Sequence, residues 1–351
     1  MKTRFQERLA AVSPRLENWW MRGEQKNPVL LITAPAPHAS PEPETDDLDA
    51  WWFDADFALR RWMHRIESQT YHGAAVPYHY VHLGAGSMAP LLGAPVEPVD
   101  RHQCRVRPSM RRIEEVIDLC FDPTHRCYRA VRDQIERSSA LARDHHFVAP
   151  FTLGGLADTA AALYGEENLA IDMMDSPAAV HRALGRLRQL WMELFDDFQR
   201  LIARGGNPGG ISRLGVWAPG STLCLRERFA RLISVEAFRR YCLPHIEDVL
   251  AVTDWPSFLL QGTGMLRHLD TLLELTDLFA FQWDPPPQRS RLCLWYDLIR
   301  HILSEGRAVQ LTAQAEEVDD LVQHVGARGV LIVVRDATPD EAEELLSRYG
   351  D

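Results

Sequence analysis

The sequence predicts an α/β protein built as a single (β/α)8 barrel with an N-terminal helical extension. Two observations predict this fold: the chain has eight short apolar segments rich in β-formers, and helical sequence follows each of them over connections long enough for parallel crossovers. The eight segments are residues 28–34, 76–83, 147–152, 210–214, 257–261, 278–283, 308–312 and 330–334. We expect residues 1–27 to form the extension, residues 28–351 to form the barrel, and functional residues to lie at the C-terminal ends of the strands.

Helices, a proline-rich loop and a long irregular segment are expected before the third strand. Apolar residues at helical spacing predict an amphipathic helix from Phe5 to Arg22, ahead of the first strand. The proline-rich acidic stretch 35–47 cannot be helical, and it is either a lid over the barrel mouth or a solvated loop. A helix is expected over 54–68, and a long excursion over 88–108 then lies above the barrel before helical sequence resumes through Arg143.

Capping signals define the later helices. Ser176-Pro177 begins a helix that reaches about Ala203, where a glycine-rich stretch breaks it before the fourth strand. Ser234 caps a helix that we expect to continue to about Val252. Thr338 caps a final helix, which we place on the outside of the barrel.

Composition excludes several function classes. The chain has 351 residues, of which 46% are hydrophobic and 25% charged, as in an ordinary folded protein with an ample core. A net charge of −11 argues against nucleic acid as a partner, and no apolar stretch approaches the ~20 residues needed to cross a bilayer. The six scattered cysteines suit reduced thiols, so we expect a cytoplasmic protein that is not associated with a membrane.

Polar side chains gather where the expected strands end. Projecting the strand ends upward collects His79, His82, Thr152, Asp158, Arg213, Trp217, Gln261, Gln282, Trp283, Asp284, Gln310 and Thr312. Such a polar mouth is the default place for a small-molecule site, although single members can simply cap strands. We expect His82, Trp217, Gln261, Gln282, Trp283 and Gln310 to bind a small-molecule substrate.

Candidates for proton transfer lie in two of these places. His79 and His82 are three residues apart, so on a regular strand they point to opposite faces and at most one faces the barrel. We take His79 as a candidate acid or base and Asp284, just before three prolines, as another; each has a structural alternative, a hydrogen-bonded strand histidine and a turn-initiating aspartate.

A run of alternating charges follows the fourth strand. We expect Arg226 and Arg228 to bind an acidic substrate and Glu227, between them, to take part in catalysis. The alternative is a solvated charge run.

At these residues the chain resembles the uroporphyrinogen decarboxylase superfamily, and within it the branch of decarboxylase-like corrinoid methyltransferases. The resembling stretches include VHLGAG (81–86), LGGLAD (153–158), WAPG (217–220), GTGMLRHLD (262–270) and Gln282-Trp283. The resemblance implies a (β/α)8 barrel with one-carbon or carboxyl chemistry in its mouth. In the methyltransferase members it also implies a zinc site and a separate corrinoid protein that docks over the barrel.

The positions that hold zinc in those relatives differ in this chain. At the end of the fifth strand the sequence reads Leu259-Leu260-Gln261-Gly262, and leucine cannot bind a metal. We therefore expect no tightly bound cofactor and no zinc, with corrinoid only on a partner protein. The first strand also lacks the arginines and the aspartate with which the decarboxylases hold a porphyrin.

These observations predict an enzyme that transfers or removes a methyl or other small group on a small molecule without the zinc site. Two alternatives stay open. One is a barrel that binds a ligand or a corrinoid protein without catalysis, and the other is a decarboxylase or other lyase acting on a small carboxylated substrate.

Overall fold

A seven-stranded, mostly parallel sheet forms the centre of this mixed α/β protein. The computed structural model describes residues 3–84 and 86–350, so Ala85 of the VHLGAG stretch lies outside the described residues. The strands, in sheet order, are β2 (Gln69–Gly73), β1 (Val29–Pro35), β13 (Val330–Val334), β12 (Ala308–Ala313), β11 (Ala280–Asp284), β10 (Trp255–Gln261) and β9 (Thr222–Leu225). All neighbours are parallel except β2, which runs antiparallel to β1.

Shorter strands lie apart from this sheet. They form three pairs: β3 (Tyr78–Tyr80) parallel to β6 (Phe147–Ala149), β4 (Val96–Pro98) antiparallel to β5 (Cys104–Val106), and β7 (Gly210–Ile211) antiparallel to β8 (Trp217–Ala218). Strand β7 contacts both β6 and β9. Within residues 3–84 and 86–350, no strand pairing joins β3 to β1 or β2, or β6 to β9, so backbone hydrogen bonds do not close the eight strands into one ring.

The predicted fourth strand is wrong. Residues 210–214 contain only the two residues of β7, and the chain then turns back through Ser212, whose N–H bonds to the Val216 carbonyl, into β8. Gly215, at φ +80°, permits this turn because glycine tolerates the left-handed region. The parallel neighbour of β10 is instead β9, which has four residues and is too short to produce a recognisable strand pattern in the sequence. Strand β2 was also missed, and the second and third strands are shorter than expected.

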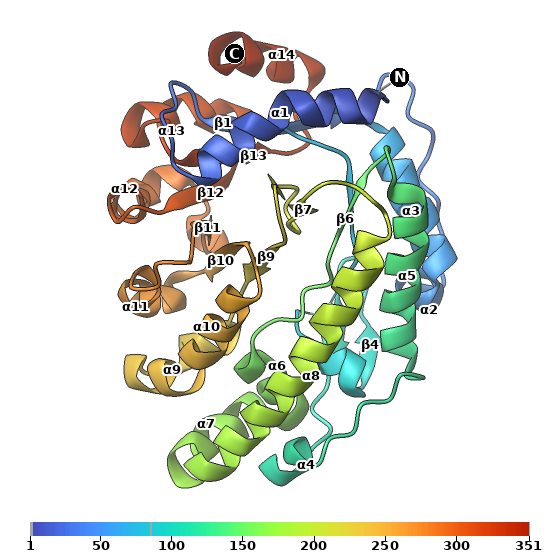
Figure 1. The fold of residues 1–351 in the computed structure, drawn as a ribbon, viewed down its shortest axis with the longest axis vertical. Coiled ribbons are helices and arrows are strands. Elements are labelled where there is room, and N and C mark those ends of the chain that lie inside the picture. Colours follow the sequence, from blue (N-terminus) through green and yellow to red (C-terminus); the bar gives the residue numbers. More distant parts are fainter. Residues whose placement is uncertain (1–2, 85, 351) are drawn as a thin grey trace.

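Helices surround the strands (Figure 1). They are α1 (Arg4–Trp20), α2 (Leu48–Phe53), α3 (Ala55–Glu67), α4 (Ile113–Ile117), α5 (Arg126–Ala142), α6 (Leu156–Tyr164), α7 (Glu166–Asp175), α8 (Pro177–Ala203), α9 (Val235–Tyr241), α10 (Leu243–Ala251), α11 (Leu269–Leu273), α12 (Tyr296–Ser304), α13 (Val318–Val325) and α14 (Pro339–Tyr349). The predicted helices α1, α3, α8 and α14 are confirmed within a few residues. The helix expected to continue from Ser234 to Val252 is broken at Cys242, because Pro244 at the start of α10 has no N–H to donate back.

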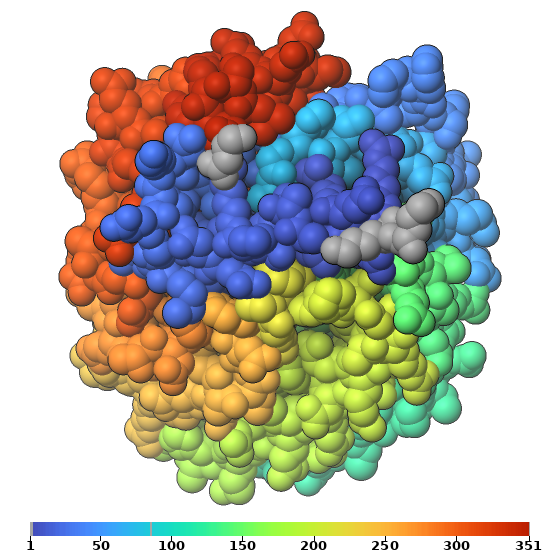
Figure 2. Space-filling view, turned by 45° about the horizontal axis from the view of Figure 1, so that its top comes forward, coloured from blue at the N-terminus to red at the C-terminus, as the bar shows by residue number. Residues whose placement is uncertain are grey.

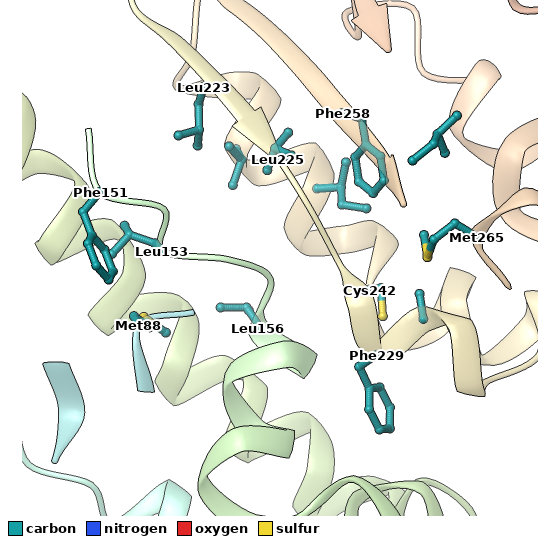
Figure 3. Close-up of a cluster of buried hydrophobic side chains, with 14 of the residues drawn as sticks. Met88, Phe151, Leu153, Leu156, Leu223, Leu225, Phe229, Cys242, Phe258 and Met265 are labelled. Carbon is teal, nitrogen blue, oxygen red and sulfur yellow. The ribbon is translucent and has the colours of Figure 1, made fainter. Parts of the chain in front are cut away.

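Side-chain alternation along the strands divides the core into two layers. One layer lies between the sheet and the helices and includes Phe258 and Phe281; Figure 3 shows part of it around β9 and β10. The other layer, which we call the inner cluster, joins Leu31, Ala280 and Leu331 of the sheet to side chains of β6, β7 and β8. The two layers show that the sheet and the short pairs pack around a common interior.

Helix α1 covers one end of the inner cluster. Its apolar face buries Trp19 and Trp20, and Trp20 Nε1 donates to the Trp217 carbonyl of β8 over 2.9 Å. In the space-filling view the N-terminal residues cover the centre of one face, between C-terminal residues in red and the yellow segment (Figure 2). Among the helices formed by the described residues, none has the length and apolar character that crossing a membrane requires.

Candidate functional site

Alternate residues of β11, β12 and β9 carry polar groups toward the interior. Gln282 pairs in register with Gln310, and both side chains are buried. The thiol of Cys224 lies 3.6 Å from Gln282 Oε1. Within the described residues, Gln310 Nε2 has no hydrogen-bond partner. A buried amide that lacks a partner is costly, so this wall retains unused hydrogen-bonding capacity.

Arg213, which contacts Gln282, lines a cavity of about 210 Å³ that we call the inner cavity. It lies between α3, strands β1, β2, β3 and β13, and the turn between β7 and β8. Its walls include Trp62, Arg65, Tyr80, His82 and Arg213.

The turn between β7 and β8 carries Arg213 into the inner cavity. The Tyr78 ring packs against Gly215, so closely that a Cβ there would come within 2.7 Å of a ring carbon. Tyr78 Oη also donates to the Arg213 carbonyl over 3.3 Å. The turn is therefore held against β3, and glycine is required where its backbone approaches the Tyr78 ring.

The Arg213 guanidinium is largely buried without a carboxylate partner. Its Nη2 donates to Gln282 Oε1 over 3.4 Å, and its Nε has no partner among the described residues. Within that part of the chain it forms no ion pair. Burial disfavours its charge, but the Cys224 side chain, Tyr80 and, more weakly, Asp284 outweigh this effect and raise the pKa of Arg213. None of these contacts is a paired carboxylate, so the guanidinium keeps N–H groups that an anionic ligand could bind. Among the side chains that line the inner cavity, this guanidinium is therefore the clearest candidate for binding an anion.

His82 and Tyr80 form another wall of the inner cavity. Their rings stack with centroids 5.2 Å apart, and Tyr80 Oη lies 2.7 Å from Thr152 Oγ1. Burial, together with Arg61 and Arg65, lowers the pKa of His82 to about 4. His82 is thus a neutral imidazole at pH 7, suited to hydrogen bonding.

Asp284 lies at the rim, where β11 ends. Its Oδ2 accepts a hydrogen bond of 2.9 Å from Nε2 of Gln261, whose side chain is exposed. Both residues are where the sequence places them, at the C-terminal ends of adjacent parallel strands. Their hydrogen bond joins the ends of β10 and β11 at this edge of the sheet.

His79 is not part of this group. It is fully buried on the helix side of β3, where its Nδ1 lies 2.9 Å from Ser138 Oγ, which in turn contacts His146 Nε2 at 3.0 Å. Burial lowers its pKa well below the usual value, with smaller contributions from His146 and His82. The structural alternative, a hydrogen-bonded strand histidine, describes this geometry, and the expected place of His79 in the mouth is wrong.

Glu227 lies in a second buried group, between the loop after β9 and α6. Its Oε1 accepts from the Asp158 backbone N–H over 2.8 Å, while Asp158 Oδ1 accepts from the Phe229 N–H over 2.7 Å. Gly155 makes room for this, since a Cβ there would collide with the Glu227 carboxylate. The two carboxyl groups thereby exchange backbone hydrogen bonds that tie the loop to the first turn of α6.

Electrostatics in this second group favours protonation. Burial raises the pKa of Glu227 well above its usual value, and the Asp158 charge adds to the effect. Burial also raises the pKa of Asp158, although Arg226 Nε, 3.8 Å from its Oδ2, opposes the shift. Figure 3 shows the apolar side chains around this point, among them Leu225, Phe229 and Cys242. The expected role of Glu227 in the mouth is not supported by its position.

Arg226 and Arg228 line a separate pocket of about 410 Å³ beside Gly84 and Gly86. The Arg226 guanidinium lies directly over Gly86, and the Arg228 side chain is exposed. They do not join Arg213 in the inner cavity.

Both tryptophans predicted to bind substrate point away from the inner cavity. Trp217 is buried near α1 and donates to the Pro208 carbonyl over 2.9 Å. Trp283 packs against Trp295 on the helix side, with ring centroids 4.9 Å apart. Because Gln282 faces inward, its neighbour Trp283 must face outward.

Sequence reasoning missed the basic side chains of α3. Arg61 and Arg65 are four residues apart, hence on one face of the helix, and Trp62 beside them lines the inner cavity. The signal in the sequence was a pair of arginines at i, i+4 spacing with Trp62 beside them.

No group of three or more His, Cys, Asp or Glu side chains placed to hold a metal ion occurs among the described residues. The expectations about zinc and corrinoid therefore stay predictions. Comparison with known proteins adds no identification: no protein-family model matches the chain, and no curated protein matches it.

Proposed function

We propose that this protein is an enzyme that binds a small carboxylated molecule in the inner cavity and removes or transfers a small group on it. The observation that carries the proposal is the largely buried Arg213 guanidinium, which lines the inner cavity, interacts with Gln282 and Cys224, and has no carboxylate partner among the described residues. A planar guanidinium matches a carboxylate through two parallel hydrogen bonds. A substrate carboxylate would supply the missing partner.

We further infer that the sheet and the pairs β3–β6 and β7–β8 together form a barrel-like enclosure. The inner cluster supports this, because it unites side chains from β1, β6, β7, β8, β11 and β13. In such an enclosure the C-terminal strand ends form the mouth, which is where His82, Gln261 and Asp284 lie.

The chemistry we favour uses Arg213 for binding and Asp284 for proton transfer. In a decarboxylation, the bond to the carboxylate carbon breaks, carbon dioxide leaves, and the electron pair stays on the substrate until a proton replaces the lost group. We assign the delivery of that proton to Asp284, at the end of β11, and the orientation of the substrate to Gln282, which contacts Arg213, and to its neighbour Gln310. Group transfer would use the same binding contacts with a different acceptor, and neither reaction needs the zinc positions.

The test is a thermal-shift screen of small carboxylic acids, each beside its uncharged amide. We expect some acids, and not their amides, to raise the Tm of the wild-type protein. Arg213→Met should abolish that rise, and the Tm of the ligand-free variant, which loses the contacts to Gln282 and Cys224, serves as its own baseline. Arg111→Met, which removes an exposed charge of the same sign, is the matched control.

Two outcomes would contradict the proposal in different ways. If Arg213→Met retains the ligand-induced rise in Tm, Arg213 is not the carboxylate site. If bound acids are recovered unchanged by mass spectrometry after prolonged incubation, binding stands and the enzymatic part fails.

A further inference from the structure

Three arginines surround a second pocket that adjoins the inner cavity. The pocket has a volume of about 440 Å³, and Arg61, Arg65 and Arg101 line it together with Trp51 and His82. We call it the arginine pocket. Arg61 and Arg65 come from α3, Trp51 from α2, and Arg101 from the loop between β4 and β5. Segments distant in sequence thus bring three positive charges to one place.

Tryptophan rings hold these guanidinium groups in position. Arg61 Cζ lies 3.7 Å and Arg101 Cζ 5.0 Å from the Trp51 ring centroid. Arg65 Cζ lies 5.4 Å from the Trp62 centroid. Three hydrogen bonds brace the group further: Arg61 Nη2 to the Trp51 carbonyl at 3.2 Å, Trp51 Nε1 to the Arg101 carbonyl at 3.1 Å, and Arg101 Nη2 to the Thr45 carbonyl at 3.0 Å. Stacking on aromatic faces orients arginine while leaving its N–H groups free to bind an anion.

The positive charge of the pocket is only partly neutralised by nearby carboxylates. Among the described residues, the single ion pair of these three arginines joins Arg101 to the exposed Asp46, at 3.8 Å. Glu42, which also lines the pocket, is exposed and forms no ion pair with them in that part of the chain. Burial, opposed by Glu42 and reinforced by Arg101 and Arg65, lowers the pKa of Arg61 to about 10. Like charges held together in this way favour the binding of an anion.

We propose that the arginine pocket binds a phosphoryl group, carried by the small molecule whose carboxylate end enters the inner cavity. A phosphoryl group offers three oxygens and nearly two negative charges, which suits three guanidinium groups better than the single charge of a carboxylate does. The arginine pocket and the inner cavity share Trp62, Arg65 and His82, so one ligand can extend across both. The phosphoryl site stands on its own geometry, and only the link to a carboxylate in the inner cavity rests on the proposed function.

The test measures the binding of inorganic phosphate and of phenyl phosphate by titration calorimetry at low ionic strength. We expect Arg65→Met, which removes no hydrogen bond recorded in the described residues, to weaken both by about tenfold or more. Arg61→Lys keeps the charge but loses the planar fork, and it should also weaken binding. Arg60→Met is the matched control, because Arg60 precedes Arg61 on α3 and is exposed; its affinities should stay within twofold of wild type.

Three results would overturn the phosphoryl site. These are an absence of binding at millimolar phosphate, an equal loss in Arg60→Met, and tighter binding of citrate than of phenyl phosphate. Arg213→Met separates this inference from the proposed function, since it should leave the affinity for inorganic phosphate unchanged. Phosphate binding that survives while carboxylic acids fail to bind would refute the proposed function alone.

Discussion

The two sides of the interior are built differently. On one side, six parallel strands from β9 through β13 to β1 form an unbroken ladder. On the other side, β3 and β6 have three residues each and β7 and β8 two. The ladder side supplies amides from ordered strands, Gln282 and Gln310, whereas the short-stranded side supplies Arg213 from a turn. The contrast indicates that the regular side provides a rigid wall and the irregular side provides charge.

Backbone pairing explains why charge gathers on the short-stranded side. In the ladder, neighbouring strands satisfy each other's N–H and carbonyl groups, and side chains such as Phe258 and Phe281 pack against helices. The turn between β7 and β8 needs glycine at positive φ and close approach to Tyr78, so its conformation is set by tertiary contacts. Turns of this kind can present a long polar side chain that a regular buried strand would exclude.

The largest expected effect tests the packing of the ladder side. Phe258→Ala should lower the free energy of unfolding by about 3–5 kcal/mol, because it removes a fully buried ring and leaves a cavity. Urea-induced unfolding followed by circular dichroism measures it. Leu294→Ala is the control: that side chain is 49% exposed, so its loss should cost less than about 0.5 kcal/mol. A cost below about 1 kcal/mol for Phe258→Ala would contradict a tightly packed wall.

The next-largest effect tests the buried Glu227 carboxyl group. Glu227→Ala should cost about 1–3 kcal/mol, because the Asp158 N–H at the first turn of α6 loses its acceptor in a buried place. Glu227→Gln keeps an acceptor oxygen and should cost clearly less. Equal losses in the two variants would show that the hydrogen bond to α6 does not account for the stabilisation.

The stability that Glu227 contributes should also depend on pH. Burial raises the pKa of Glu227, so around neutral pH the folded protein binds more protons than the unfolded chain. This group therefore contributes less stability as pH rises above the ordinary carboxyl value toward the raised one. From pH 5 to pH 8, the Tm of wild type should fall relative to that of Glu227→Gln. A difference that stays constant across this range would mean that Glu227 ionises normally.

The smallest effect concerns backbone freedom on the short-stranded side. Gly185→Ala should stabilise the protein by about 0.5–1 kcal/mol, since Gly185 lies in the interior of α8 with open space around it. Gly154→Ala should instead destabilise it, because Gly154 has φ +69° and an added Cβ would lie 2.6 Å from the Gly86 carbonyl oxygen. Thermal unfolding of both variants checks the sign. Stabilisation by Gly154→Ala would contradict the close approach of these two loops.

The regular side was predictable because its signals are local. Strands β10 to β13 are continuous apolar runs bounded by turn residues. Helices α8 and α14 begin at Ser176-Pro177 and Thr338-Pro339, as predicted, although the Thr338 side chain caps its helix and the Ser176 side chain does not. The positions of Gln282, Asp284 and Gln261 follow from where those strands end. Short strands such as β9 carry too few residues to produce a pattern, and the hairpin of β7 and β8 resembles one strand until Gly215 is recognised as its turn.

From the order of residues alone follow the α/β class, most of the ladder and the polar ends of its strands, because alternation and capping act between near neighbours in the chain. Which of those polar groups meet was decided by the tertiary structure. His79 and Trp283 are buried on the helix side and do not line the inner cavity. Arg213 does line it, because Tyr78 packs against Gly215 and fixes the turn that carries Arg213. The side a residue faces on a two-residue strand, and the charge that remains unpaired around it, depend on contacts between distant segments.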